Sequence, residues 1–190
     1  MLFRSVEDGT PIYTDYLNGE LPDEDEVADL YAYGCELLKE RGYRRYEISN
    51  FAKKGKESRH NLNYWRRGEY IGFGLSASSF MMGNRLTNTF DLDEYIKCVL
   101  SGFVPVVDSE GVTAKDARFE KVMLALRTAE GLDVAAFEKE FGVSFTELYG
   151  DALRKNREFL AVKGGRLKIK DEYLYIQNSI LMPFMEDSQK

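Results

Sequence analysis

The sequence predicts an α/β fold of α+β character that ends in a helical winged-helix-like domain. Three observations support this prediction. Apolar residues at helical spacing lie between cap residues near the N-terminus, a glycine-rich strand pattern lies in the middle, and capped short helices precede an alternating hairpin pattern near the C-terminus. With 44% hydrophobic and 13% aromatic residues among 190, the chain can build one large or two small packed domains.

Two helices are expected in the N-terminal part. The first starts after Pro22, because four acidic residues follow this proline and both features favour a first helical turn. Gly42 ends this helix. The second is capped by Asp91 with Glu94 and closed by Gly102. The apolar positions that define the first helix are Val27, Leu30, Tyr31, Gly34, Leu37 and Leu38.

Two strands are expected between these helices. Tyr46 and Ile48 alternate with charged residues, and a second strand spans about residues 70–80, where glycine, serine and alanine leave little side-chain bulk. Such a strand either lets a ligand or another backbone approach closely or is a tightly packed interior strand. The polar segment between the two strands is expected to form an exposed loop.

The sequence changes character after residue 108, so the predicted domains are residues 1–108 and 109–190. The second domain begins with a helix capped by Thr113, followed by two further helices, a hairpin and a closing helix, which is a winged-helix-like order. The signals for these elements are the cap residues Asp133 and Ser144, the stop residue Gly142, the turn pair Gly164 and Gly165, and the apolar spacing in 171–185.

The segment 59–65 is where a binding site is expected, because it holds the only histidine, His60, and the only tryptophan, Trp65. Residues 41–67 around it carry nine lysines and arginines against two acidic residues, which favours an anionic ligand. Two plainer interpretations stay open. The segment could be a solvated basic loop, or its histidine and asparagine could bind the backbone while its aromatic side chains fill a domain junction.

Nucleic-acid binding is a further hypothesis, because the third helix and the hairpin of the C-terminal domain carry basic residues that could contact phosphates. The C-terminal part has no net charge, however, and the chain carries −6. A solvated basic face is therefore the favoured interpretation, and nucleic acid is a disfavoured partner. The basic residues are Arg154, Lys155, Arg157, Lys163, Arg166, Lys168 and Lys170.

The remaining composition argues against several protein classes. Cys35 and Cys98 lie far apart, each within a predicted helix, so neither a disulfide framework nor a metal-binding pair is predicted. The sequence has no run of about 18 apolar residues and no secretory pattern. A cytoplasmic chain without a transmembrane segment is therefore expected.

Four motifs together resemble one known family. They are Glu-x-Gly-Thr-Pro at 7–11, Tyr-Glu-Ile-Ser-Asn-Phe-Ala at 46–52, Ser-Arg-His-Asn-Leu-Asn-Tyr-Trp at 58–65, and Gly-Phe-Gly-x-x-Ala-x-Ser at 72–79. In this order and spacing they resemble the radical-SAM coproporphyrinogen III oxidase family. The His-Asn-x-x-Tyr-Trp signature is similar to that of the oxidase-like heme chaperones within it, and the resemblance covers nearly the whole chain.

The resemblance implies that the chain is the C-terminal half of a longer protein of heme metabolism. Residues 1–108 would be the terminal elements of a radical-SAM barrel with a linker region, and residues 109–190 the winged-helix-like domain. Heme or a porphyrin would be the ligand, with His60 as the heme-iron ligand. The other implied heme-binding residues are Asn61, Tyr64 and Trp65, and the implied partners of the propionates are Arg59, Arg66, Arg67, Lys53, Lys54 and Lys56.

The resemblance also implies a cofactor site in the full-length parent protein. Leu62, Gly74, Ser76 and Ala77 would form one wall of a pocket for S-adenosylmethionine. Apolar surface on this chain would then face the N-terminal half of the barrel. We expect such surface to bind that half or to drive self-association.

Two departures from the family pattern limit what the chain itself is expected to do. It lacks the family's Cys-x-x-x-Cys-x-x-Cys loop, which holds a [4Fe–4S] cluster, so neither cluster-dependent activity nor a catalytic residue is expected. Ser78 stands where many heme chaperones have a histidine. An alternative is a parent that is a true oxygen-independent coproporphyrinogen III oxidase, although the His-Asn-x-x-Tyr-Trp signature favours a chaperone.

Overall fold

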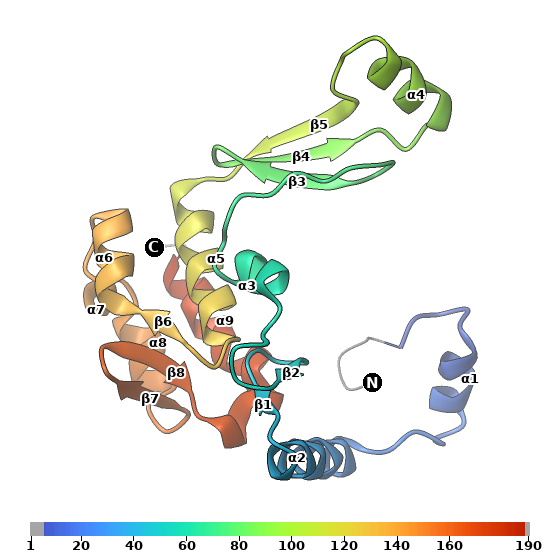
Figure 1. Cartoon of the computed structure of the whole chain (residues 1–190). Helices are drawn as coiled ribbons and strands as arrows, with labels where there is room; N and C mark the ends of the chain where they lie inside the picture. The colour runs from blue at the N-terminus through green and yellow to red at the C-terminus, as the bar shows by residue number, and fades with distance from the viewer. Residues whose placement is uncertain (1–5, 189–190) are drawn as a thin grey trace.

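The computed structural model describes residues 6–188 and combines helices with three small antiparallel sheets (Figure 1). This agrees with the predicted α+β fold. Among the described residues, no helix is both long enough and apolar enough to span a membrane. The elements are α1 (Pro11–Leu17), α2 (Glu24–Glu40), β1 (Arg44–Arg45), β2 (Phe51–Ala52), α3 (Arg59–Trp65), β3 (Ser78–Met81), β4 (Asn84–Asn88), α4 (Leu92–Leu100), β5 (Val106–Gly111), α5 (Ala114–Leu126), β6 (Leu132–Asp133), α6 (Val134–Phe141), α7 (Phe145–Leu148), α8 (Gly150–Lys155), β7 (Leu160–Lys163), β8 (Arg166–Ile169), the 3₁₀ helix η1 (Asp171–Ile176) and α9 (Gln177–Ser188).

The hydrophobic core lies in the C-terminal part, from α5 to α9. The elements follow in winged-helix-like order, and β8 lies between β6 and β7 in the sheet. Phe137, Phe145 and Tyr149 fill the centre, with ring centroids 5.2 Å apart for the first pair and 4.9 Å for the second. Phe184 of α9 packs on Tyr149, 5.5 Å between centroids. These four aromatic side chains are fully buried and contribute large apolar areas to the core of the unit.

The capping residues predicted for this part are confirmed. Thr113, Asp133 and Ser144 each accept a backbone hydrogen bond at a helix start, and Gly142 ends α6 in the left-handed conformation (φ 66°). One predicted helix differs. One helix was expected after Ser144. The segment instead breaks at Tyr149 into α7 and α8, because Tyr149 leaves the helical backbone conformation (φ −110°, ψ 24°).

Helix α2 and the short hairpin β1–β2 follow α1 in the N-terminal part. The helix start predicted after Pro22 is confirmed, and Asp23 and Glu26 make a reciprocal capping box there. The Tyr31 hydroxyl donates a hydrogen bond to the carbonyl oxygen of Ile48 (3.1 Å), which fixes α2 on the segment between the strands. The prediction of a strand at residues 46–48 was wrong, since β1 and β2 flank this segment and pair with each other.

Strands β3, β4 and β5 form the second sheet. The strand predicted for residues 70–80 was too long, because only 78–81 belong to β3 and Tyr70 makes an isolated bridge to Phe80. Gly74 (φ 108°) and Ser76 (φ 56°) turn the chain in between. Strand β5 pairs with β4 and runs across residues 108 and 109, where the sequence predicted a domain boundary. The boundary itself stays a prediction.

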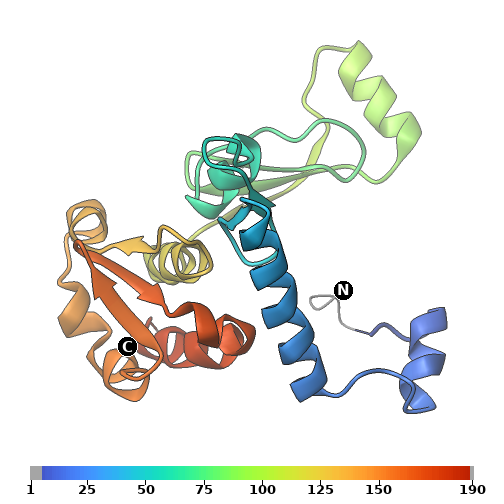
Figure 2. The same cartoon turned by 60° about the horizontal axis from the view of Figure 1, so that its bottom comes forward.

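Helix α4 lies at the end of this sheet that is remote from α5 (Figures 1 and 2). Asp91 caps it and Gly102 follows it, as predicted. Its apolar side chains do not enter a core, since Leu100 is 82% exposed and Phe103 just beyond it 71% exposed. The sheet and α4 therefore form an arm with an apolar surface. Further exposed apolar residues on the arm are Phe90, Leu92, Ile96, Val99 and Val104.

Candidate functional site

The segment 59–65 is a helix, α3, and the prediction of a loop was wrong. Ser58 caps it, with its Oγ accepting a hydrogen bond from the backbone N–H of Asn61 (3.3 Å). After the helix, Arg67 takes a left-handed conformation (φ 59°) and the chain turns. The segment has no apolar helical period that would have indicated a helix. As a consequence, the predicted heme-binding residues all lie on one helix.

His60 and Tyr64 lie one turn apart on an exposed face of α3. The Tyr64 hydroxyl is 3.0 Å from Nε2 of His60, and the two rings are nearly perpendicular (85°) with centroids 4.8 Å apart. On its other side, Tyr64 contacts the ring of Tyr70 edge to face, at 4.7 Å. The three rings form a continuous aromatic row that ends at the only imidazole of the chain.

The other motif residues lie on a more buried side of α3. Asn61, Leu62 and Trp65 are half-buried, and Asn61 and Trp65 again lie one turn apart. The structure therefore divides the motif into an accessible pair, His60 with Tyr64, and a packed pair, Asn61 with Trp65. A ligand that approaches from solvent meets the first pair.

The remaining predicted site residues lie in the glycine-rich loop, residues 72–77. Hydrogen bonds from β4 and α4 fix this loop: Asn88 Nδ2 donates to the carbonyl of Gly74 (2.9 Å), and the backbone N–H of Gly74 donates to the Tyr95 hydroxyl (3.1 Å). The N–H of Ser76 donates to the carbonyl of Thr89 (3.0 Å). The backbone of Gly74, Ser76 and Ala77 thus lies beside the sheet of β3, β4 and β5. Leu62, the fourth residue predicted for this pocket, lies on α3 instead.

Most arginines near His60 have protein partners. Arg66 pairs with Glu130 (2.9 Å), and Arg67 pairs through Nε with Glu120 (2.8 Å). Lys53 lies over the Tyr43 ring at 5.5 Å. Among the cations proposed for propionates, the described contacts therefore leave Arg59, Lys54 and Lys56 most available, and Arg59 directly precedes His60 on α3.

Glu120 is a structural residue of this site that the sequence did not indicate. It lies on α5, its side chain is 13% exposed, and it also accepts from Arg85 of β4. Arg67 in addition lies over the Phe80 ring at 4.8 Å. One carboxylate therefore joins α3, the second sheet and the C-terminal unit. Sequence offers no signal for it, because its partners are 53 and 35 positions away.

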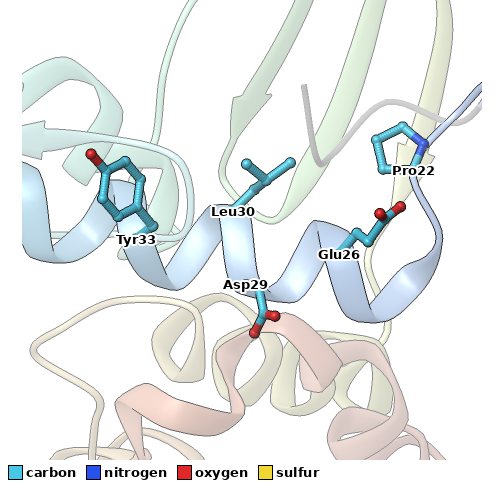
Figure 3. A pocket seen from close by; sticks show the side chains of 5 residues that line it. All are labelled: Pro22, Glu26, Asp29, Leu30 and Tyr33. Atoms are coloured by element: carbon cyan, nitrogen blue, oxygen red, sulfur yellow. The ribbon is translucent and has the colours of Figure 1, made fainter.

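Two surface hollows lie away from α3. One, of about 420 Å³, is lined by Pro22, Glu26, Asp29, Leu30 and Tyr33 of α2 and its approach (Figure 3). Its lining comes from one helix, and Asp29 points away from Leu30, so no set of polar groups converges on a ligand. The other lies among Arg154, Lys155, Arg157 and Glu158.

Most of the basic side chains that were considered for nucleic-acid binding form ion pairs or hydrogen bonds within the protein. Arg154 pairs with Asp151, Lys155 with Glu186 (3.0 Å), and Arg166 with Asp133 (3.4 Å). Lys168 and Lys170 donate to backbone carbonyls of Ala129 and Glu158. Phosphate binding would compete with these interactions, so the structure favours the interpretation of a solvated, internally balanced face.

The side chains fit heme better than an iron–sulfur cluster. An exposed imidazole beside aromatic rings could serve as an axial ligand of heme iron. Cys35 on α2 and Cys98 on α4 are the only cysteines of the sequence, fewer than the three thiolates of a radical-SAM cluster. Within residues 6–188, no group of three or more histidine, cysteine and acidic side chains is placed to hold a metal ion.

The chain is similar to known proteins over most of its length. Residues 112–176 match the family model of the HemN C-terminal domain. The heme chaperone HemW of Lactococcus lactis is 34% identical over 169 residues, which cover 88% of this chain and 44% of that protein. The heme chaperone HemW of Bacillus subtilis is 34% identical over 161 residues, 84% of this chain and 41% of that protein. The chain thus spans less than half the length of these relatives.

A solved structure extends the match to the fold. Coproporphyrinogen III oxidase (HemN) from Escherichia coli, described as a radical SAM enzyme, superposes with a TM-score of 0.66 over 87% of this chain and 42% of the other, at 17% identity. At this identity the superposition reports on architecture alone. In sequence and fold together, the chain belongs to the radical-SAM coproporphyrinogen III oxidase family, where it corresponds to the C-terminal half and has heme chaperones as relatives.

Proposed function

We propose that the chain is the heme-binding C-terminal portion of a heme chaperone, with His60 as the axial ligand of the iron. The observation that carries this proposal is the exposed imidazole on α3 with an aromatic row beside it. A heme iron needs a neutral imidazole nitrogen that it can reach, and a porphyrin needs flat apolar surface nearby. The identity of about one third with heme chaperones supports the same ligand.

Arg59 is the proposed partner of a porphyrin propionate. It lies beside His60, it is exposed, and its planar guanidinium can bind a carboxylate through two hydrogen bonds. Lys54 and Lys56 add positive charge to the approach. Asn61 and Trp65 are proposed to support α3 from its packed side.

In the full-length parent we propose that Leu62, Gly74, Ser76 and Ala77 line one side of an S-adenosylmethionine pocket. The backbone turn at Gly74 (φ 108°) and Ser76 (φ 56°) is the feature that supports this role. S-adenosylmethionine bound to a [4Fe–4S] cluster would supply radical chemistry there. The three thiolates for such a cluster would have to come from outside this chain.

The test is a titration of the purified chain with hemin, followed by the Soret band. We expect a saturable one-to-one band that weakens or shifts in His60→Ala, because this sequence contains one histidine. A Cys35→Ser/Cys98→Ser double variant is the control, since a thiolate is the other strong iron ligand in the sequence. A band that persists unchanged in His60→Ala, or no saturable band, would contradict the proposal.

We further propose that the apolar surface of the arm is covered by another protein surface in the functional state. The supporting observation is the number of large apolar side chains that α4 and its flanks expose, Leu100 and Phe103 above all. The occupant would be the remaining part of the family's barrel or, failing that, a second copy. We expect concentration-dependent self-association of the chain, which Leu100→Glu reduces. A monomer at high concentration in analytical ultracentrifugation would argue against it.

A further inference from the structure

The Tyr64 hydroxyl lies at hydrogen-bond distance from Nε2 of His60, which is the ring nitrogen that an iron would most readily use. Nε2 lies farthest from the backbone, and it is one of the two ring nitrogens that bind metals. Tyr64 Oη lies 3.0 Å from it. A neutral imidazole can accept at Nε2 only when its proton is on Nδ1. The phenol O–H is a good donor and its oxygen a weak acceptor, so the pair favours donation from Tyr64 to Nε2.

The position of Tyr64 is fixed from its other side. Its ring contacts that of Tyr70 at 4.7 Å and 80°. Tyr70 is in turn held by two backbone hydrogen bonds to Phe80, both 2.9 Å. The segment between α3 and Tyr70 is also fixed. Asn63 Nδ2 donates a hydrogen bond to the carbonyl of Glu69 (3.0 Å), and the Asn63 side chain packs against Gly68. The hydroxyl is therefore directed at His60 by the contact with Tyr70, which is bonded to Phe80 of β3, as well as by the helix.

We infer that Tyr64 is a positioning residue that presets His60 for iron and at the same time competes with iron for Nε2. This inference rests on the proposed heme binding. Donation from Tyr64 selects the Nδ1–H tautomer, which is the form with a lone pair on Nε2. Iron that binds there breaks one exposed hydrogen bond, which corresponds to about a two- to twelve-fold loss of affinity.

The first test needs no heme. In the ¹⁵N-labelled chain, a long-range ¹H–¹⁵N correlation spectrum of the single imidazole identifies its tautomer at a pH where it is neutral. We expect the Nδ1–H form in the wild type and a shift towards Nε2–H, the form that an isolated histidine prefers, in Tyr64→Phe. Tyr43→Phe is the matched control, since both tyrosines are 37% exposed and Tyr43 lies beside Lys53. The same tautomer in wild type and Tyr64→Phe would refute the inference.

The second test is hemin binding. Tyr64→Phe keeps the aromatic ring and removes the hydroxyl, so we expect it to bind hemin more tightly than the wild type, with the same His60-dependent Soret band. The gain should be smaller than the roughly two- to twelve-fold that the lost hydrogen bond alone would give, because the imidazole of the variant must first shift from Nε2–H to Nδ1–H. Equal or weaker binding overturns the competition. If hemin binding does not depend on His60 at all, the proposed function fails, and the tautomer spectrum alone then decides whether Tyr64 positions the ring.

Discussion

Gly72 is packed so closely against β3 that no larger residue fits. A Cβ atom placed there would overlap the carbonyl group of Ser78 and press on the Cβ of Ala77 at 3.1 Å. We expect Gly72→Ala to lower the free energy of unfolding by about 1–3 kcal/mol, as overpacking does. Gly111→Ala in β5 is the control, because its Cβ would meet only Asn84 Oδ1 at 3.5 Å. Urea unfolding measures both, and equal effects would contradict the steric argument.

Tyr31 makes the docking of α2 sensitive to alkaline pH. Burial, opposed by the charge of Arg45, raises the pKa of Tyr31 from about 10 to about 12. Because the folded pKa lies above the unfolded one, the stabilisation is complete below about pH 10 and is lost as the pH rises from about 10 to about 12.

The test is the difference in unfolding free energy between the wild type and Tyr31→Phe, measured from neutral pH to about pH 11. We expect the advantage of the wild type to shrink above about pH 10, because the unfolded chain then loses the phenolic proton first. Burial also raises the pKa of Tyr149, but both proteins contain this residue, so its contribution to the pH dependence cancels in the difference. A difference that stays constant over this range would contradict the prediction.

At the scale of elements, Glu120 determines how α3 is held. It accepts from Arg67 at the end of α3 and from Arg85 of β4, and it is largely buried. We expect Glu120→Gln to destabilise the chain by about 1–3 kcal/mol, because it leaves a half-buried guanidinium without its counter-charge. Glu36→Gln is the control, since Glu36 pairs with Lys39 at the surface with 65% of its side chain exposed. That change should stay within about 0.5 kcal/mol.

The elements also show what could be predicted from the sequence. The caps at Asp91, Thr113, Asp133 and Ser144 are confirmed, because capping depends on residues three positions apart. Helix α3 was predicted wrongly, since its six polar or aromatic residues and single leucine give no apolar period and only the cap serine marks its start. Strand β5 was missed, because its exposed residues show no apolar alternation and its existence depends on pairing with β4.

The candidate site also has a part that could be predicted from the sequence and a part that could not. The sequence placed His60, Asn61, Tyr64 and Trp65 in one segment, but it did not indicate that this segment is a helix. It could not indicate that Nε2 of His60 meets Tyr64, because a helix was not expected there. It also could not indicate Glu120, whose partners are brought together only by the packing of α5 against α3. Their roles in heme binding stay predictions.

At the scale of the whole molecule, stability is concentrated in the C-terminal unit. The main cluster of buried apolar residues runs from Val122 to Phe184, whereas α1, α3 and α4 contain no buried residue. We expect amide hydrogens of α5, β8 and α9 to exchange several orders of magnitude more slowly than those of α1 and α4. Hydrogen exchange followed by mass spectrometry measures this. Similar protection in α4 and α9 would show that the arm is as stable as the core.

The single tryptophan gives the proposed site its own optical reporter. Trp65 lies on the same short helix as His60, five residues along the chain, which is about 7.5 Å of helical rise. Its emission overlaps the absorption of a porphyrin, so excitation energy passes to a bound heme and the fluorescence is quenched. The unmodified chain can therefore report, without any attached dye, whether a chromophore resides at α3.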